Sequence, residues 1–168
     1  MGPLTATDLR DIQADNEFAV GKRLAAAYAD IETGRRGPDA ALGMLQTWDA
    51  QNAADSGAAA YANMLWDELV ESLFVTGRDG AAPTTDQGRL FLVVQNLLED
   101  PASEWWTNEE LGVDGQREML VHAADAAYDR LVALQGEDPG RWNWGGLHAL
   151  PLNSATFGES GIAPIEML

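Results

Sequence analysis

Hydrophobic residues recur every three or four positions along most of the chain, which is the spacing of amphipathic α-helices. The first such stretch runs from Thr5 to about Ile31, and Thr5 or Thr7 is its expected N-cap. We expect either Asn16 or Gly21 to bend or break this helix. Its apolar positions are Leu9, Ile12, Phe18, Leu24, Tyr28 and Ile31.

Two further helices are expected before residue 76. A Gly-bounded turn precedes Pro38, which is suited to a first helical turn, and the short helix that follows is expected to end near Asn52. Asp55 or Ser56 can cap a longer helix that runs to about Val75. The apolar stripe of the shorter helix comprises Ala41, Leu42, Leu45 and Trp48.

The apolar run RLFLVVQNLLED at residues 89–100 fits either a strand or a helix by periodicity alone. A possible N-cap at Thr84 or Thr85 favours a helix, as does the polar interruption at Gln95 and Asn96. We therefore expect a fourth helix here.

The last helical pattern covers residues 116–135, with Gly136 as its C-terminal stop, after an irregular segment at residues 101–115. The pattern as a whole predicts a mainly α fold of five or six helices in an irregular bundle, with little or no sheet. We expect a helical domain over residues 1–140 and an extended Trp/Gly-rich tail over residues 141–168.

The chain is strongly acidic, with 27 acidic and 10 basic residues and a formal net charge of −17. Such a charge repels nucleic acid phosphates and anionic lipid head groups, so we expect neither nucleic acid nor membrane as a partner. The chain contains no cysteine, which excludes disulfides and thiolate chemistry. No stretch reaches the ~20 apolar residues of a membrane-spanning helix, and the first residues show no signal-peptide pattern.

Candidate catalytic groups are few. His122 and His148 lack the spacing of metal-binding motifs. Ser160 lies in Gly-Glu-Ser-Gly, but Ile162 occupies the last glycine position of a nucleophile elbow, and no strand is predicted before it. A pair of Ser160 and His148 would lack a recognisable orienting acid. We therefore expect no catalytic, cofactor-binding or metal-binding residue.

Acidic residues are numerous enough for close pairs to arise by chance, so a solvated face is their expected role. The loop at residues 49–55 has oxygen ligands but not the pattern of an EF-hand, and is expected to form a turn and a helix cap. The most evident acidic pairs are Asp11/Asp15, Glu109/Glu110 and Asp125/Asp129.

Tryptophan residues offer two interpretations. Trp105 with Trp106, and Trp142 with Trp144, could form stacking platforms for a sugar or a peptide. They could equally pack in the core, and burial against the helices is the favoured interpretation because exposed tryptophan is unfavourable.

Several stretches, in order, together carry a family resemblance. They are LTATDLRDIQAD (residues 4–15), LQTWD (45–49), DSGAAAY (55–61), the Trp105-Trp106 pair, WNWGGLH (142–148) and GESGIAPIE (158–166). Taken together, the chain resembles the penicillin amidases (penicillin acylases), whose relatives include acyl-homoserine lactone acylases. The WNWGGLH and GESGIAPIE stretches are the most specific, and the resemblance covers the helical middle part of the large (β) subunit.

This resemblance implies an N-terminal nucleophile hydrolase, which cleaves its own precursor to expose a serine at a new chain start. The α-amine of that serine acts as the general base for its hydroxyl group. This chain begins Met1-Gly2-Pro3 and contains no Asn-Trp-Asn motif for the oxyanion, so we expect it to be inactive alone. Relatives continue past the equivalent of Glu166 with further strands, so the resemblance also implies a truncated piece of a larger acylase.

We therefore expect a non-catalytic helical segment of an acylase that hydrolyses the linear amide bond of penicillins or N-acyl-homoserine lactones. Its expected partner is the remainder of that acylase, with homo-oligomers or exchange of elements possible through exposed apolar surface. The alternatives are a stand-alone helical binding module that uses the Trp-rich tail, and a serine hydrolase that uses Ser160. Family members are often periplasmic or secreted, and the location of this chain stays open.

Overall fold

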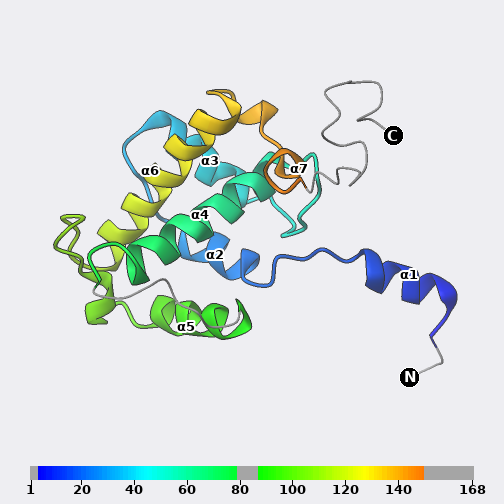
Figure 1. The fold of residues 1–168 in the computed structure, drawn as a ribbon, viewed down its shortest axis with the longest axis horizontal. Helices are drawn as coiled ribbons and strands as arrows, with labels where there is room; N and C mark the ends of the chain where they lie inside the picture. Colours follow the sequence, from blue (N-terminus) through cyan, green and yellow to red (C-terminus); the bar gives the residue numbers. More distant parts are fainter. Residues whose placement is uncertain (1–3, 79–86, 150–168) are drawn as a thin grey trace, which may run out of the picture.

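The computed structural model describes residues 4–78 and 87–149, and this part of the chain is mainly helical (Figure 1). Within these residues there are two isolated β-bridges and no strand, so the predicted mainly α fold is confirmed. The α-helices are α1 (Ala6–Ala14), α2 (Gly21–Ala27), α3 (Arg36–Leu45), α4 (Gly57–Phe74), α5 (Gln87–Glu99), α6 (Gln116–Gln135) and α7 (Trp144–Leu147).

The first predicted helix is divided into α1 and α2, with the break between Asn16 and Gly21 as expected. The backbone is extended at the break because Glu17 forms a β-bridge with Gln51, and the Phe18 amide donates to the carbonyl oxygen of Ala50 over 2.7 Å. Pairing with a segment more than thirty residues away therefore replaces the helical hydrogen bonds here.

Helix α3 ends at Leu45, earlier than the predicted end near Asn52. The residues after α3 pair with the extended segment between α1 and α2, through the bridge between Gln51 and Glu17. Ala50 also has a positive φ of 67°, which does not fit a helix. Trp48 consequently lies in the loop rather than in the helix. Its indole N–H donates to the Gln51 carbonyl oxygen over 2.9 Å, and its ring tilts against Phe18.

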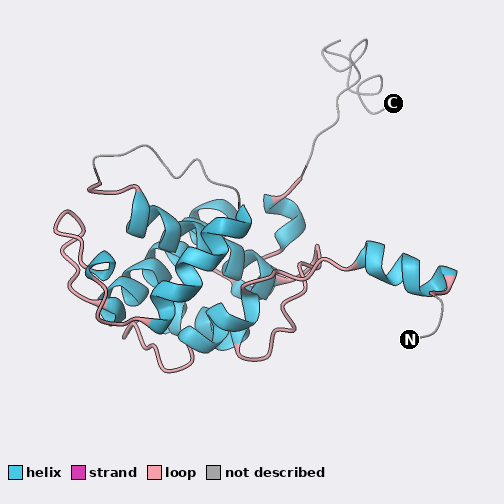
Figure 2. Cartoon of the chain, turned by 90° about the horizontal axis from the view of Figure 1, so that it is seen from below, coloured by secondary structure: helices cyan, strands magenta, loops and turns pink. Residues whose placement is uncertain are grey.

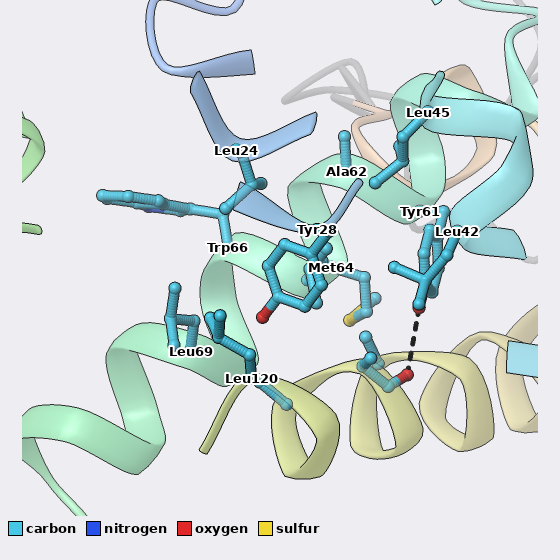
Figure 3. Close-up of a cluster of buried hydrophobic side chains, with 14 of the residues drawn as sticks. Leu24, Tyr28, Leu42, Leu45, Tyr61, Ala62, Met64, Trp66, Leu69 and Leu120 are labelled. Atoms are coloured by element: carbon cyan, nitrogen blue, oxygen red, sulfur yellow. Dashed lines mark hydrogen bonds between the residues drawn. The ribbon is translucent and has the colours of Figure 1, made fainter. Parts of the chain in front are cut away.

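Helices α4 and α6 form the centre of the fold and cross each other in Figure 1. Ser56 caps α4 by accepting a hydrogen bond from the Ala59 amide over 3.0 Å, and Gly136 ends α6 with a positive φ of 88°. The Tyr61 hydroxyl donates to the Ala124 carbonyl oxygen across the two helices over 3.1 Å (Figure 3). Small buried side chains allow the close approach: Ala59, Ala60, Ala62, Ala123, Ala124 and Ala127.

The remaining elements bury apolar side chains against this centre. Leu24 of α2, Leu42 of α3 and Val94 of α5 are all buried in one core. Phe18, just before α2, packs edge-on against Trp66 of α4 and Phe91 of α5, with ring centroids 6.3 and 6.0 Å apart. The chain between helices thus contributes to the core as well as the helices themselves.

The segment between α5 and α6 contains a 3₁₀ turn, Glu104–Trp106, and an isolated bridge between Asn108 and Val113. Asn108 is buried and organises the turn. Its side-chain amide donates to the carbonyl oxygens of Ser72 and Thr76, and its Oδ1 accepts from the amide of Glu110. The segment predicted as irregular is therefore held by one satisfied polar side chain.

The first part of the predicted tail packs on the helical body through a second 3₁₀ turn, Pro139–Arg141, and the short helix α7. The Gly145 amide donates to the Ala54 carbonyl oxygen over 2.7 Å, which attaches α7 to the loop before α4. The domain boundary at residue 140 stays a prediction, and residues 150–168 lie outside the described residues.

Candidate functional site

The two histidines lie in different parts of the molecule. His122 is half-buried on α6, whereas His148 is exposed after α7 and stacks on Trp144 with ring centroids 5.0 Å apart. Asn143, next to α7, accepts a hydrogen bond at its carbonyl oxygen from Gln135 at the far end of α6. His122 and Gln135 are separated by roughly 20 Å along the helix axis, so the two imidazoles do not share a site.

The serines in the described residues have structural contacts. Ser56 caps α4, and Ser103 caps the 3₁₀ turn by accepting from the Trp105 amide. Ser72 is buried in α4, and none of these serines hydrogen-bonds a histidine in residues 4–78 and 87–149. Ser160 and the GESGIAPIE stretch lie outside the described residues, so the prediction for them is untested.

The pair Asp125 and Asp129 binds an arginine at the surface, where Asp129 is exposed, as predicted, and Asp125 is half-buried. Arg35, before α3, lies 2.7 Å from the Asp129 carboxylate and 3.1 Å from that of Asp125, with its guanidinium over the Tyr128 ring. The hydrogen bond from Arg35 lowers the pKa of Asp129 below its ordinary value. This network links the residue before α3 to α6 and engages both carboxylates of this pair.

The other acidic pairs are exposed, as predicted. Asp11 accepts from Arg10 over 2.8 Å, Asp15 accepts from the Glu17 amide, and Glu109 and Glu110 both face solvent. No group of three or more histidine, aspartate or glutamate side chains in the described ranges could hold a metal ion.

The loop at residues 49–55 forms the predicted turn and cap. Asp49 Oδ1 accepts from the Gln51 amide over 2.9 Å, an arrangement typical of an Asx turn. Ser56, one of the two predicted caps, is the residue that caps α4, whereas Asp55 is exposed.

The tryptophans divide between core and surface. Trp142 is buried between Tyr61 and Tyr128, with ring centroids 6.2 and 5.6 Å away, and its indole N–H donates to the Gly136 carbonyl oxygen. Trp106 is buried as well. The predicted burial is therefore correct for Trp106 and Trp142.

Burial is wrong for Trp105, whose exposed fraction is 43%. The 3₁₀ turn directs its ring outward, where it packs on Phe74 and lies beneath the guanidinium of Arg78 at 5.2 Å. Arg78 also donates to the carbonyl oxygens of Trp105 and Thr107. This contact stabilises the turn and covers one face of the Trp105 ring.

The most unusual feature is α1, which extends away from the other helices in both Figure 1 and Figure 2. None of its residues is buried. Leu9 and Ile12, which belong to the apolar pattern of the first predicted helix, are 51% and 61% exposed, and Leu4 before them is 65% exposed. The break at residues 15–20 carries α1 away from the body, so this part of the apolar pattern does not join the core that contains Phe18, Leu24 and Tyr28.

A shallow depression lies along one side of α1, where the helix meets Gln51. It combines apolar and acidic side chains, and its lining includes Leu4, Asp8, Asp11, Ile12, Asp15 and Gln51. Sequence reasoning gave the apolar residues no surface role and Asp11 and Asp15 only a solvated one, and so missed this surface. The signal that could have revealed it is the polar break after a short, capped helix.

The comparisons give the family. The profile of the family described as penicillin amidase matches residues 1–167. No curated protein and no solved structure matches the chain. The match covers almost the whole chain, including the α1 segment, the α4–α6 core and the Trp142 region. The chain therefore belongs to the penicillin amidase family, a family of amidase-type acylases.

Proposed function

We propose that this chain is a non-catalytic helical part of a penicillin-amidase-type acylase that hydrolyses the amide bond of penicillins or N-acyl-homoserine lactones. The observation that carries the proposal is the family match over residues 1–167, on a chain whose described residues form a helical scaffold. The choice between the two substrate classes is part of the proposal.

The contacts of the polar residues support a scaffold role. An N-terminal nucleophile needs a hydroxyl group beside its own α-amine and donors placed for the oxyanion. In the described residues, Ser56 and Ser103 cap helical turns, and His122 and His148 lie on separate elements. The contacts of these groups in the described residues support a role in folding rather than in attack on an amide.

The packed core also supports a scaffold role, because it holds the helices in fixed positions. The ring of Trp142 fixes the start of the tail against α4 and α6, and Arg35 fixes α3 on α6 through two aspartates. Such a body can support the catalytic part of an acylase, whose reacting groups need fixed geometry.

The binding-module alternative receives no support from the tryptophans. Trp142 is buried at 2% exposure, and Trp144 is already covered by His148 on one face. A platform would need open aromatic faces.

The proposal is tested by two assays on the purified protein. The chain alone is incubated with benzylpenicillin and, separately, with an N-acyl-homoserine lactone, and acid release is measured by chromatography; we expect none. The chain is then co-expressed with the segment of a penicillin amidase that carries the N-terminal serine, and we expect amide hydrolysis to appear. Turnover by the chain alone that disappears in Ser160→Ala would contradict the proposal.

A further inference from the structure

We propose that α1 is a docking arm, and that its exposed face binds an apolar groove flanked by lysine or arginine side chains on the catalytic part of the acylase. The inference rests on the proposed function and names the element and the partner surface involved. It is carried by the apolar residues of α1, by the way the helix is held, and by the charge beside them.

The apolar residues lie together on the surface of the arm. Leu9 and Ile12 are three positions apart, and therefore neighbours on a helix surface, and Leu4 lies just before the N-cap Thr5. All three side chains are more than half exposed in a helix without a single buried residue. An apolar stripe on a helix that packs on nothing of its own chain is typical of a binding element.

The helix is prepared for binding by its N-terminal cap. Thr5 Oγ1 accepts from the Asp8 amide over 3.2 Å, while the Asp8 carboxylate accepts from the Thr5 amide over 2.7 Å, which completes a capping box. Leu4 and Leu9 occupy the N′ and N4 positions of a hydrophobic staple. A nine-residue helix is marginal in water, so these devices reduce the entropy that is lost on docking.

The base of the arm is fixed to the body. The Asn16 side chain donates to the Asn52 carbonyl oxygen over 2.8 Å, and the Asn52 amide donates to the Asn16 carbonyl oxygen over 3.1 Å. Phe18, two residues later, is buried in the core. The arm therefore leaves the body from a defined point.

The negative charge beside the apolar stripe favours a partner surface that carries positive charge. Asp8, Asp11 and Asp15 line the same depression as Leu4 and Ile12. Arg10 is the one basic residue of α1, and it pairs with Asp11. A groove that receives this face must therefore supply positive charge beside its apolar centre.

A second copy of the chain is the less suited occupant. Its described surface has an apolar depression beside Arg23, but Glu99 lies in the same depression and pairs with Arg23 over 3.2 Å. The chain has a net charge of −17, and its ten basic residues all lie in the described ranges. Most of these cations are already engaged, and two identical acidic chains repel each other. Ion pairs engage Arg10, Lys22, Arg23, Arg35 and Arg130, and backbone carbonyl oxygens engage Arg78 and Arg117.

The experiment measures the affinity of the chain for the serine-bearing segment of a penicillin amidase by titration calorimetry. The test variant is the double substitution Leu9→Ala and Ile12→Ala, and the control is Leu134→Ala, an exposed leucine on α6 with 59% exposure. We expect the double variant to raise Kd about tenfold or more and the control to leave it within about twofold. Added NaCl should weaken the wild-type complex.

The outcomes separate the docking role of α1 from the proposed function. Equal affinities of the wild type and the double variant would overturn the docking role of α1 while leaving the proposed function intact. Absence of any complex would overturn both. A dimer of the chain alone that the double variant abolishes, measured by light scattering, would show that a second copy is the occupant and overturn the proposed partner. An unchanged thermal midpoint of the double variant confirms that the fold is intact.

Discussion

Tyr28 carries a hydroxyl group that has no hydrogen-bond partner in the described residues, although the side chain is buried. Burial raises the pKa of this phenol well above its ordinary value. In Figure 3 its ring lies in the core, with the hydroxyl toward the side where Leu69 and Leu120 lie. Tyr61 is the matched case, because its hydroxyl donates to the Ala124 carbonyl oxygen.

We expect Tyr28→Phe to leave the free energy of unfolding unchanged or to raise it by up to about 1 kcal/mol, because the substitution removes an unpaired buried hydroxyl. Tyr61→Phe should lower it by about 1 kcal/mol or more, because the Ala124 carbonyl oxygen loses its donor. Urea unfolding followed by circular dichroism measures both. A Tyr28→Phe variant that is the less stable of the two would show that the Tyr28 hydroxyl is paired.

Single residues also show what the sequence could and could not predict. Trp105 and Trp106 are adjacent and chemically identical, yet one is exposed and the other buried. The difference depends on the 3₁₀ turn capped by Ser103 and on the stacking of Arg78, which comes from a distant part of the chain. Residue type predicted burial, but only the turn decides which of the two rings is buried.

At the scale of elements, helical periodicity correctly predicted α4, α5 and α6. These helices bury one face each in a core formed by their neighbours, so pattern and position agree. The separation of α1 could not be predicted in the same way, because Leu9 and Ile12 form the same stripe whether they face a core or another protein. The extended pairing of Glu17 with Gln51 decides the matter, and it is a contact between distant segments.

Removal of a helix cap should distinguish the helices of the body from α1. Ser56→Ala should lower the global free energy of unfolding by about 1 kcal/mol, because α4 is part of the central core. Thr5→Ala removes the cap of α1 and should lower only the local helicity, with a global change below about 0.3 kcal/mol. Thermal unfolding and amide hydrogen exchange measure the two effects. Equal global losses would mean that α1 folds together with the body.

At the scale of the whole molecule, the helical body and the start of the Trp-rich region form one packed unit. Trp142 stacks on Tyr61 of α4, packs edge-on against Tyr128 of α6, and donates to the Gly136 carbonyl oxygen. A boundary chosen from composition at residue 140 therefore falls beside a buried anchor. The boundary at residue 140 stays a prediction, and Trp142 just beyond it belongs to the same buried core as α4 and α6.

We expect Trp142→Ala to lower the free energy of unfolding by about 3–5 kcal/mol, because it removes a large ring from the core. The matched control is Trp144→Ala, which removes a half-buried ring that stacks on His148 and should cost less. Denaturant unfolding followed by far-UV circular dichroism compares them. A Trp142→Ala variant with wild-type stability would contradict the role of Trp142 in the core. It would favour the alternative in which Trp142 stacks on a ligand.

The packing of Phe18 against two tryptophans makes tryptophan fluorescence sensitive to the position of this ring. The ring sits within 6.3 Å of both Trp48 and Trp66, at the point from which the arm leaves. Phe18 follows Asn16, the base of α1, by two residues, so a displacement of α1 would shift the Phe18 ring. Such a shift would change the environment of the Trp48 and Trp66 indoles. Intrinsic tryptophan fluorescence could then follow the proposed docking of α1 without any added label.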